Sequence, residues 1–264
     1  MLDIHGRQSL KQLLDTVSET EMIIDDQRYE LNRNPHFAPL TAFHRIDRMN
    51  RNGISSSDLQ AFFQQNGHHG ISIGECGKVI QTFDRNQDGL LTVEDFSNMV
   101  LNCKDKHLRL EAQHRQPNRC GSFAPLHESV ERQLVQIFLN EVDLQKRVLL
   151  LMKDLKRQPG YSIQSVFNTV DSMNEKFWNP ANIGDFFLHC CGVSLIMPEI
   201  YAMIRRMSTH MDARVSLEEF AAFVGEPLYH DSRPNDRYIE HRATEFQTPS
   251  HLSANIERTI ADHR

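Results

Sequence analysis

What the 264-residue sequence lacks already excludes several classes of protein. No apolar run approaches the roughly 18 residues that a transmembrane helix needs. The N-terminal stretch MLDIHGRQSLKQLLDTV has neither the apolar core nor the small-residue cleavage site of a signal peptide. The sequence has five cysteines, which are scattered along the chain and form no CxxC pair. An odd, scattered set is typical of reduced thiols inside a cell. We therefore expect a cytoplasmic protein with no membrane partner.

Signals for catalysis and for nucleic-acid binding are also missing. The sequence contains no glycine-rich nucleotide loop, no GxSxG and no HExxH, so we expect no enzymatic activity. The net charge is −6 and no stretch is dense in Lys and Arg, which argues against a nucleic-acid partner. With 39% hydrophobic and 24% charged residues, the composition is that of a globular protein.

What the sequence does contain is an internal repeat with an offset of 124 residues. The block FHRIDRMNRNGISSSDLQAFF at 43–63 aligns with FNTVDSMNEKFWNPANIGDFF at 167–187, and the block at 80–100 aligns with 204–224. At the same offset Asp88 matches Asp212 and Pro35 matches Pro159. Self-similarity over about 100 residues indicates a duplicated unit.

Apolar residues at helical spacing predict that each repeat unit begins with a long helix. They are Leu10, Leu13, Leu14, Val17 and Ile24 in the first unit, and Leu134, Ile137, Phe138, Leu144, Val148, Leu151 and Leu155 in the second. Pro35 and Pro159 are expected to end these helices. The stretch HRQPNRCGSFAPLH at 114–127 holds two prolines and a glycine, which is typical of a linker. The polar stretch 225–264 lies outside the repeat, with a short helix expected near 253–262.

The stretch FDRNQDGLLTVEDF at 83–96 has the composition of a metal-binding loop. Ca²⁺ prefers six or seven hard oxygen ligands, which a 12-residue loop supplies from positions 1, 3, 5, 7, 9 and 12, with a glycine at position 6 for the turn. Here these ligands are Asp84, Asn86, Asp88, the Leu90 carbonyl, Thr92 (directly or through water) and Asp95. A turn rich in Asp and Asn that binds no metal is the alternative.

At this stretch the chain resembles the EF-hand family. The resemblance implies an all-α fold with two EF-hand pairs, that is, four helix–loop–helix units whose loops pair through short β-bridges. Each pair is preceded by an additional helix, which gives domains at 1–113 and 128–224, a linker at 114–127 and a tail at 225–264. Position 12 is Asp95, not the glutamate typical of the family, and the shorter side chain makes bidentate coordination harder. We therefore expect one Ca²⁺ site that is weak or shared with Mg²⁺.

The other three loops are expected to hold no metal and to be kept for packing. The loop at 47–58 has Arg51 at an inner position, where a guanidinium repels a cation. The loop at 171–182 has Lys176 inside, and the loop at 208–219 begins with Ser208 where an acid is needed. All four loops keep an apolar residue at position 8, the expected bridge position: Ile54, Leu91, Trp178 and Val215.

More loosely, residues 7–225 resemble the EF-hand-pair proteins that line the inside of the doublet microtubules of cilia and flagella. The likeness is carried by RQSLKQLLDTVSETEMIIDDQRYEL, PHFAPLTAFHRIDRMNRNGIS and FDRNQDGLLTVEDF. It implies a structural protein of the axoneme that binds tubulin and neighbouring microtubule inner proteins, with calcium as a modulator. The alternative is a soluble cytosolic protein that binds target helices in response to calcium. No dense methionine cluster marks a groove for such helices, which favours the structural interpretation.

Overall fold

Helices make up nearly all of the regular structure. The computed structural model describes residues 2–117, 125–209 and 212–226. Within them lie α1 (Ile4–Arg33), α2 (Pro39–Ile46), α3 (Ser56–Gln65), α4 (Ile73–Phe83), α5 (Val93–Val100), α6 (Lys106–Gln113), α7 (Glu128–Lys156), α8 (Ile163–Val170), β1 (Phe177–Trp178), α9 (Pro180–Asp185), the π-helix η1 (Phe186–Cys190), α10 (Met197–Met207), β2 (Val215–Ser216) and α11 (Leu217–Phe223). The fold class is therefore all-α, as predicted. Half of the predicted linker and most of the predicted tail, with the helix expected near 253–262, lie outside the described residues.

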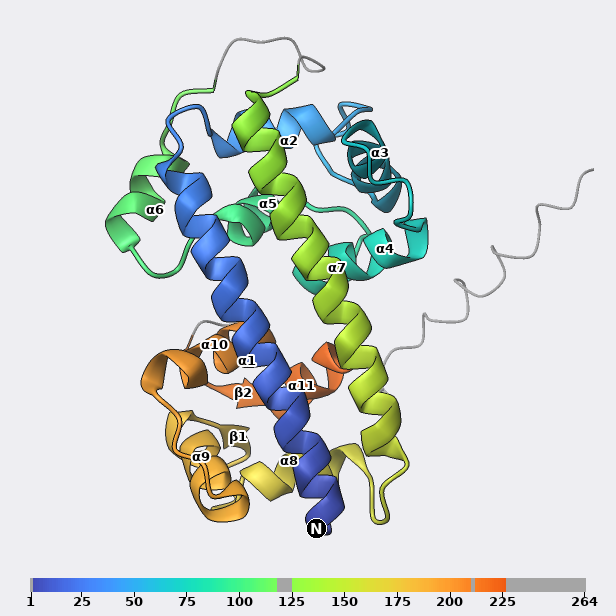
Figure 1. Cartoon of the computed structure of the whole chain (residues 1–264), viewed down its shortest axis with the longest axis vertical. Helices are drawn as coiled ribbons and strands as arrows, with labels where there is room; N and C mark the ends of the chain where they lie inside the picture. Colours follow the sequence, from blue (N-terminus) through green and yellow to red (C-terminus); the bar gives the residue numbers. More distant parts are fainter. Residues whose placement is uncertain (1, 118–124, 210–211, 227–264) are drawn as a thin grey trace, which may run out of the picture. The chain divides into compact units, whose positions relative to one another are not determined.

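The two long helices, α1 and α7, lie side by side and run antiparallel (Figure 1). Asn34 at the end of α1 contacts Ser129 at the start of α7 at 2.9 Å, and Gln27 contacts Asn140 further along at 2.9 Å. The predicted apolar stripes form their shared face, since residues such as Leu14 are fully buried. Both helices end two or three residues before a proline, at Arg33 and Lys156, so this prediction is confirmed.

Each long helix contacts both halves of the repeat. In α1, Ser18 donates a hydrogen bond to the Glu199 carbonyl at 2.9 Å in the second half, while Asn32 donates to the Val100 carbonyl at 3.0 Å in the first. In α7, the Phe138 ring packs edge-on against rings of the first half, and Lys156 pairs with Glu226 after the last helix of the second. The contacts accordingly group Met1–Pro227, with both predicted halves, in one compact unit.

The four predicted loops each connect two short helices, and the loops pair with one another. Ile54 and Leu91 form an antiparallel bridge with hydrogen bonds of 3.0 and 2.9 Å. In the second half Trp178 pairs with Val215 in the antiparallel β1–β2 ladder. These are the four position-8 residues, and all four are buried. Short β pairing between loops thus holds the helix pairs together through their most apolar loop residues.

The aromatic residues fill the core on either side of these pairings. Trp178 is fully buried, stacks on Phe167 with ring centroids 5.1 Å apart and donates from Nε1 to the Phe167 carbonyl at 2.9 Å. The lone tryptophan is therefore a core residue. Within the described ranges no helix is both long enough and apolar enough to cross a lipid bilayer.

Candidate metal centre

The loop at 84–95 connects the end of α4 to the start of α5. Asp84 is the C-cap of α4, and Thr92 is the N-cap of α5. Between them Gly89 has φ +83°, in the left-handed region that L side chains adopt only under strain. A Cβ there would meet nothing within 4 Å, so the backbone conformation and not the available space favours glycine.

The acids at the start of this loop accept hydrogen bonds from its backbone. Asp84 Oδ1 accepts from the Gln87 N–H at 2.8 Å, and Oδ2 accepts from the Gly89 N–H at 2.7 Å. Asp88 Oδ1 accepts from the Leu90 N–H at 2.8 Å. These are the bonds of a turn rich in Asp and Asn, so the metal-free alternative describes them as well as the metal-loop prediction does.

Asp95, at position 12, caps the helix that follows. Its Oδ2 accepts from the Thr92 N–H at 3.1 Å and from the Thr92 hydroxyl at 2.7 Å, while Thr92 Oγ1 accepts from the Asp95 N–H at 3.2 Å. This reciprocal arrangement is a capping box. The same box recurs at positions 9 and 12 of the other three loops: Ser55–Asp58, Asn179–Asn182 and Ser216–Glu219. The side chain at position 12, an acid in three of the four loops and Asn182 in the other, therefore has a local structural role whether or not metal binds.

The six predicted ligands lie in this one loop and differ in their exposure. Asp84 and Asp95 are buried at its two ends, whereas Asn86 and Asp88 are exposed. Within the described residues no three His, Cys, Asp or Glu side chains are gathered closely enough to hold a metal ion. The donor chemistry nevertheless fits Ca²⁺ or Mg²⁺, because every ligand is an oxygen and a carboxylate oxygen that accepts one hydrogen bond keeps another lone pair.

The neighbouring loop at 47–58 carries a cation of its own. The Arg51 guanidinium donates from Nη2 to Ser55 Oγ at 3.0 Å and to Asp58 Oδ2 at 2.8 Å, the side chains at positions 9 and 12. Its backbone N–H donates to Asp47 Oδ1 at 3.1 Å. Arg51 thus joins three positions that would be ligands in a metal-binding loop, and the loop closes through its own side chain.

The two loops of the second half also close through protein groups. Lys176 donates from Nζ to Asn174 Oδ1 at 2.7 Å and from its backbone N–H to Asp171 Oδ2 at 2.9 Å. In the last loop, Glu219 Oε1 accepts from the backbone N–H and the hydroxyl of Thr209 at 2.6 and 2.7 Å. In both loops, side chains at predicted ligand positions thus bond to other residues of the same loop.

Sequence reasoning missed a buried ion-pair network between the halves. Arg28 on α1 pairs with Glu21 at 2.8 Å and with Glu141 of α7 at 3.0 Å, and Arg206 of α10 pairs with Glu141 at 2.5 Å. These four side chains are at most 3% exposed. Glu21 and Arg28 lie on the same helical stripe as the apolar residues of α1, and that position was the available signal that they would be buried.

Mutual attraction keeps this network charged. Burial raises the pKa of Glu21, but Arg28, Arg206 and Arg205 lower it by more, so the net pKa lies below the ordinary value. Burial likewise lowers the pKa of Arg28, and Glu21 and Glu141 more than restore it. Removing one partner from such a network leaves a buried unpaired charge, which typically costs about 3–5 kcal/mol.

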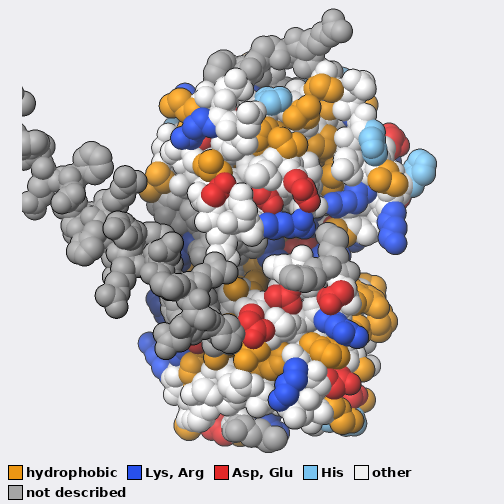
Figure 2. Space-filling view, turned by 180° about the vertical axis from the view of Figure 1, so that it is seen from behind, with side chains coloured by type: hydrophobic (Ala, Val, Ile, Leu, Met, Phe, Trp, Pro, Cys, Tyr) orange, Lys and Arg blue, Asp and Glu red, His pale blue; other side chains and the backbone are white. Residues whose placement is uncertain are grey.

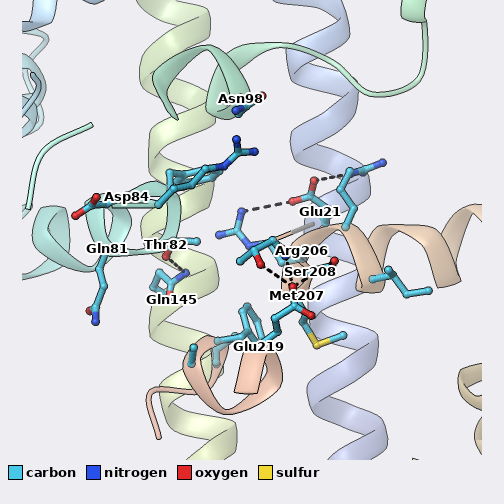
Figure 3. Close-up of a pocket in the computed structure, with 18 of the residues that line it drawn as sticks. Glu21, Gln81, Thr82, Asp84, Asn98, Gln145, Arg206, Met207, Ser208 and Glu219 are labelled. Atoms are coloured by element: carbon cyan, nitrogen blue, oxygen red, sulfur yellow. Dashed lines mark hydrogen bonds and ion pairs between the residues drawn. The ribbon is translucent and has the colours of Figure 1, made fainter. Parts of the chain in front are cut away.

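A cleft of about 690 Å³ opens between the two halves beside this network (Figure 3). Asp84 lines it from the end of α4, and Glu219 lines it from α11 on the opposite side. The Arg206 guanidinium lies 5.2 Å from the centre of the Phe83 ring, so a residue of the second half touches the residue just before Asp84. The predicted metal loop therefore borders both the cleft and the contact between the halves.

No protein-family model matches the chain, and no curated protein matches it. The EF-hand assignment therefore stays a prediction from the motif and the repeat.

Proposed function

We propose that the chain is a structural EF-hand protein that holds two hand pairs in a fixed arrangement and takes up Ca²⁺ at a single loop. The observation that carries this proposal is the buried network of Glu21, Arg28, Glu141 and Arg206, which joins α1, α7 and α10. Sliding one half against the other would expose or unpair these charges at a cost of several kcal/mol. A rigid body with most of its loops closed by its own side chains suits a scaffold better than a switch.

Calcium would be held by Asp84, Asn86, Asp88, the Leu90 carbonyl, Thr92 and Asp95. When bound, the two positive charges of the ion would offset most of the negative charge of the loop's three carboxylates. Asp84 and Asp95 would then tie the end of α4 to the start of α5, because each already caps its helix. The short Asp95 side chain makes the site weak, or shared with Mg²⁺.

Calorimetric titration of the full chain tests this site. Wild type is expected to give one Ca²⁺-binding event, and Asp88→Ala, which changes an exposed ligand, is expected to lose it. Asp212→Ala, the matching change in the last loop, should keep the event and serves as the control. Absence of heat from wild type at about millimolar Ca²⁺, the weak end of the range for such loops, would overturn the assignment.

We propose further that the scaffold belongs to the axoneme of cilia or flagella, where tubulin and neighbouring microtubule inner proteins are its partners. This step rests on the looser resemblance of residues 7–225. It agrees with a protein whose halves are fixed, since a lattice component must keep its shape. Axonemes stripped of membrane and washed in high salt should retain the chain while proteins of the outer surface are released. Complete release of the chain would rule out a place inside the microtubule.

The alternative, a calcium-dependent regulator that binds target helices, is favoured by one observation. Asp84 is both a predicted ligand and part of the cleft wall, so metal binding would alter that wall. A tenfold preference of calcium for one conformation would supply about 1.4 kcal/mol. Capture of partners from a cell extract with calcium but not with a chelator would support this alternative, and equal capture would rule it out.

A further inference from the structure

The cleft between the halves has two chemically different walls. Its lining includes seven Lys or Arg residues and three Asp or Glu residues. From the first half, Lys78 of α4 and Lys106 and Arg109 of α6 line the cleft, whereas Leu149, Tyr201 and Phe223 line it from α7, α10 and α11. Figure 2 shows the recess between the two halves, with Lys and Arg side chains along its upper edge.

The basic residues of the cleft fall into two groups by their partners. Arg28, Arg205 and Arg206 are neutralised by Glu21, Asp25 and Glu141 of the network, and Arg85 pairs with Glu94. In contrast, Lys78 and Lys106 are exposed and make no ion pair with any described residue. The hydrogen bonds of Arg109 go to the neutral oxygens of Asn98, Leu101 and Asn102. On this side of the cleft, three cations without an ion pair to a described residue, Lys78, Lys106 and Arg109, therefore outnumber the one carboxylate, Asp84.

The opposite wall offers apolar surface. Tyr201 is 44% exposed, which is high for a large side chain beside a cavity, and Leu149 and Phe223 are half-buried. A small anion would satisfy the cations but leave this surface in water. A cleft of about 690 Å³ lies within the range of roughly 300–1,000 Å³ that ligand sites commonly have, so there is room for side chains to enter.

We propose that this cleft binds an amphipathic acidic segment of a partner protein, with its carboxylates toward Lys78 and Lys106 and its apolar face toward Tyr201 and Phe223. Such a segment satisfies both walls at once, which neither a purely apolar helix nor a simple anion does. The inference requires neither metal at 84–95 nor a place in the axoneme.

The test uses the full chain and a fluorescein-labelled peptide of about 16 residues, long enough for a helix to form on binding, with Glu on one helical face and Leu on the other. Fluorescence polarisation is expected to show binding to wild type. The double variant Lys78→Glu/Lys106→Glu should weaken binding at least about tenfold, because it turns attraction into repulsion. Lys153→Glu changes an exposed lysine of α7 outside the cleft and should leave affinity within about twofold.

Two further measurements examine each wall by itself. Tyr201→Ser, at a half-exposed position that the fold tolerates, should also weaken binding of the peptide, and circular dichroism will show that each variant is folded. A peptide with Lys in place of Glu and a single-stranded RNA of equal charge should both bind more weakly than the acidic peptide. The proposal is overturned if wild type does not bind the acidic peptide, if the double variant binds it as well as wild type, or if the RNA binds equally tightly.

Discussion

The loops at 47–58 and 84–95 pair across one β-bridge, yet the side chains at their matching position 5 have opposite charge. The first contains a guanidinium, Arg51, that bonds to the side chains of Ser55 and Asp58. The second has Asp88 at the matching position, and Asp84, Asp88 and Asp95 accept hydrogen bonds from groups of the same loop. The two loops therefore differ in the charge at position 5, where the first has a guanidinium bonded to two other ligand positions and the second has a carboxylate. Both loops nevertheless end in the same capping box and share the same bridge.

The shared bridge gives the largest expected effect. Leu91 and Ile54 are each 1% exposed, so Leu91→Ala leaves a cavity under both loops and should lower the free energy of unfolding by about 2–4 kcal/mol. Denaturant titration measures this change. Val93→Ala, two residues on at a 37% exposed site, should change it by less than about 0.5 kcal/mol. A loss under about 1 kcal/mol for Leu91→Ala would mean that the loops are held independently.

The matched pair Asp58→Asn and Asp95→Asn separates the two loops directly. Without calcium, Asp58→Asn should cost up to about 1 kcal/mol, because it removes the charge that faces the half-exposed Arg51. Asp95→Asn should be nearly neutral without calcium, because Asp95 has no ion pair within the described residues.

In the presence of calcium, we expect the order of stability of the two variants to reverse. Wild type and Asp58→Asn should both gain stability by mass action, whereas Asp95→Asn should gain none. Thermal unfolding with calcium and with a chelator measures both effects. If Asp58→Asn also abolished the calcium effect, the two loops would be acting as one site.

The smallest effect concerns the helices that lead into the loops. Arg45 of α2 pairs with Glu131 of α7 at 2.8 Å, and Glu75 of α4 pairs with Lys146 of α7 at 2.7 Å. Hydrogen bonds from Lys146 and Ser72 lower the pKa of Glu75 from 4.5 to about 2. The stabilisation is therefore fully present above pH 4.5 and is lost as the pH falls toward 2. Wild type and Glu75→Gln should differ in urea midpoint at neutral pH and converge at low pH; a constant difference would mean that Glu75 acts through packing.

The sequence predicted the loops better than it predicted their chemistry. Positions 9 and 12 are ligand positions and also the capping box of the next helix, so Thr92 and Asp95 satisfy two patterns at once. The effect of Arg51 was predicted only as repulsion of a cation. Its bonds to Ser55 and Asp58 depend on how the side chain folds back over the loop, which the spacing of residues does not specify.

Local patterns determined the helices, their ends and the four paired loops, because helical periodicity, prolines, caps and position-8 apolar residues act over a few residues. Only the tertiary structure decided that α1 and α7 each contact both halves. It also decided that a cleft forms between the two halves, with basic residues on one side and apolar residues on the other. Glu21 meets Arg206 from 185 residues away, and Arg28 meets Glu141 from 113. Such long-range pairs form when burial brings distant helices together and makes an unpaired charge costly, so no local stretch of sequence encodes them.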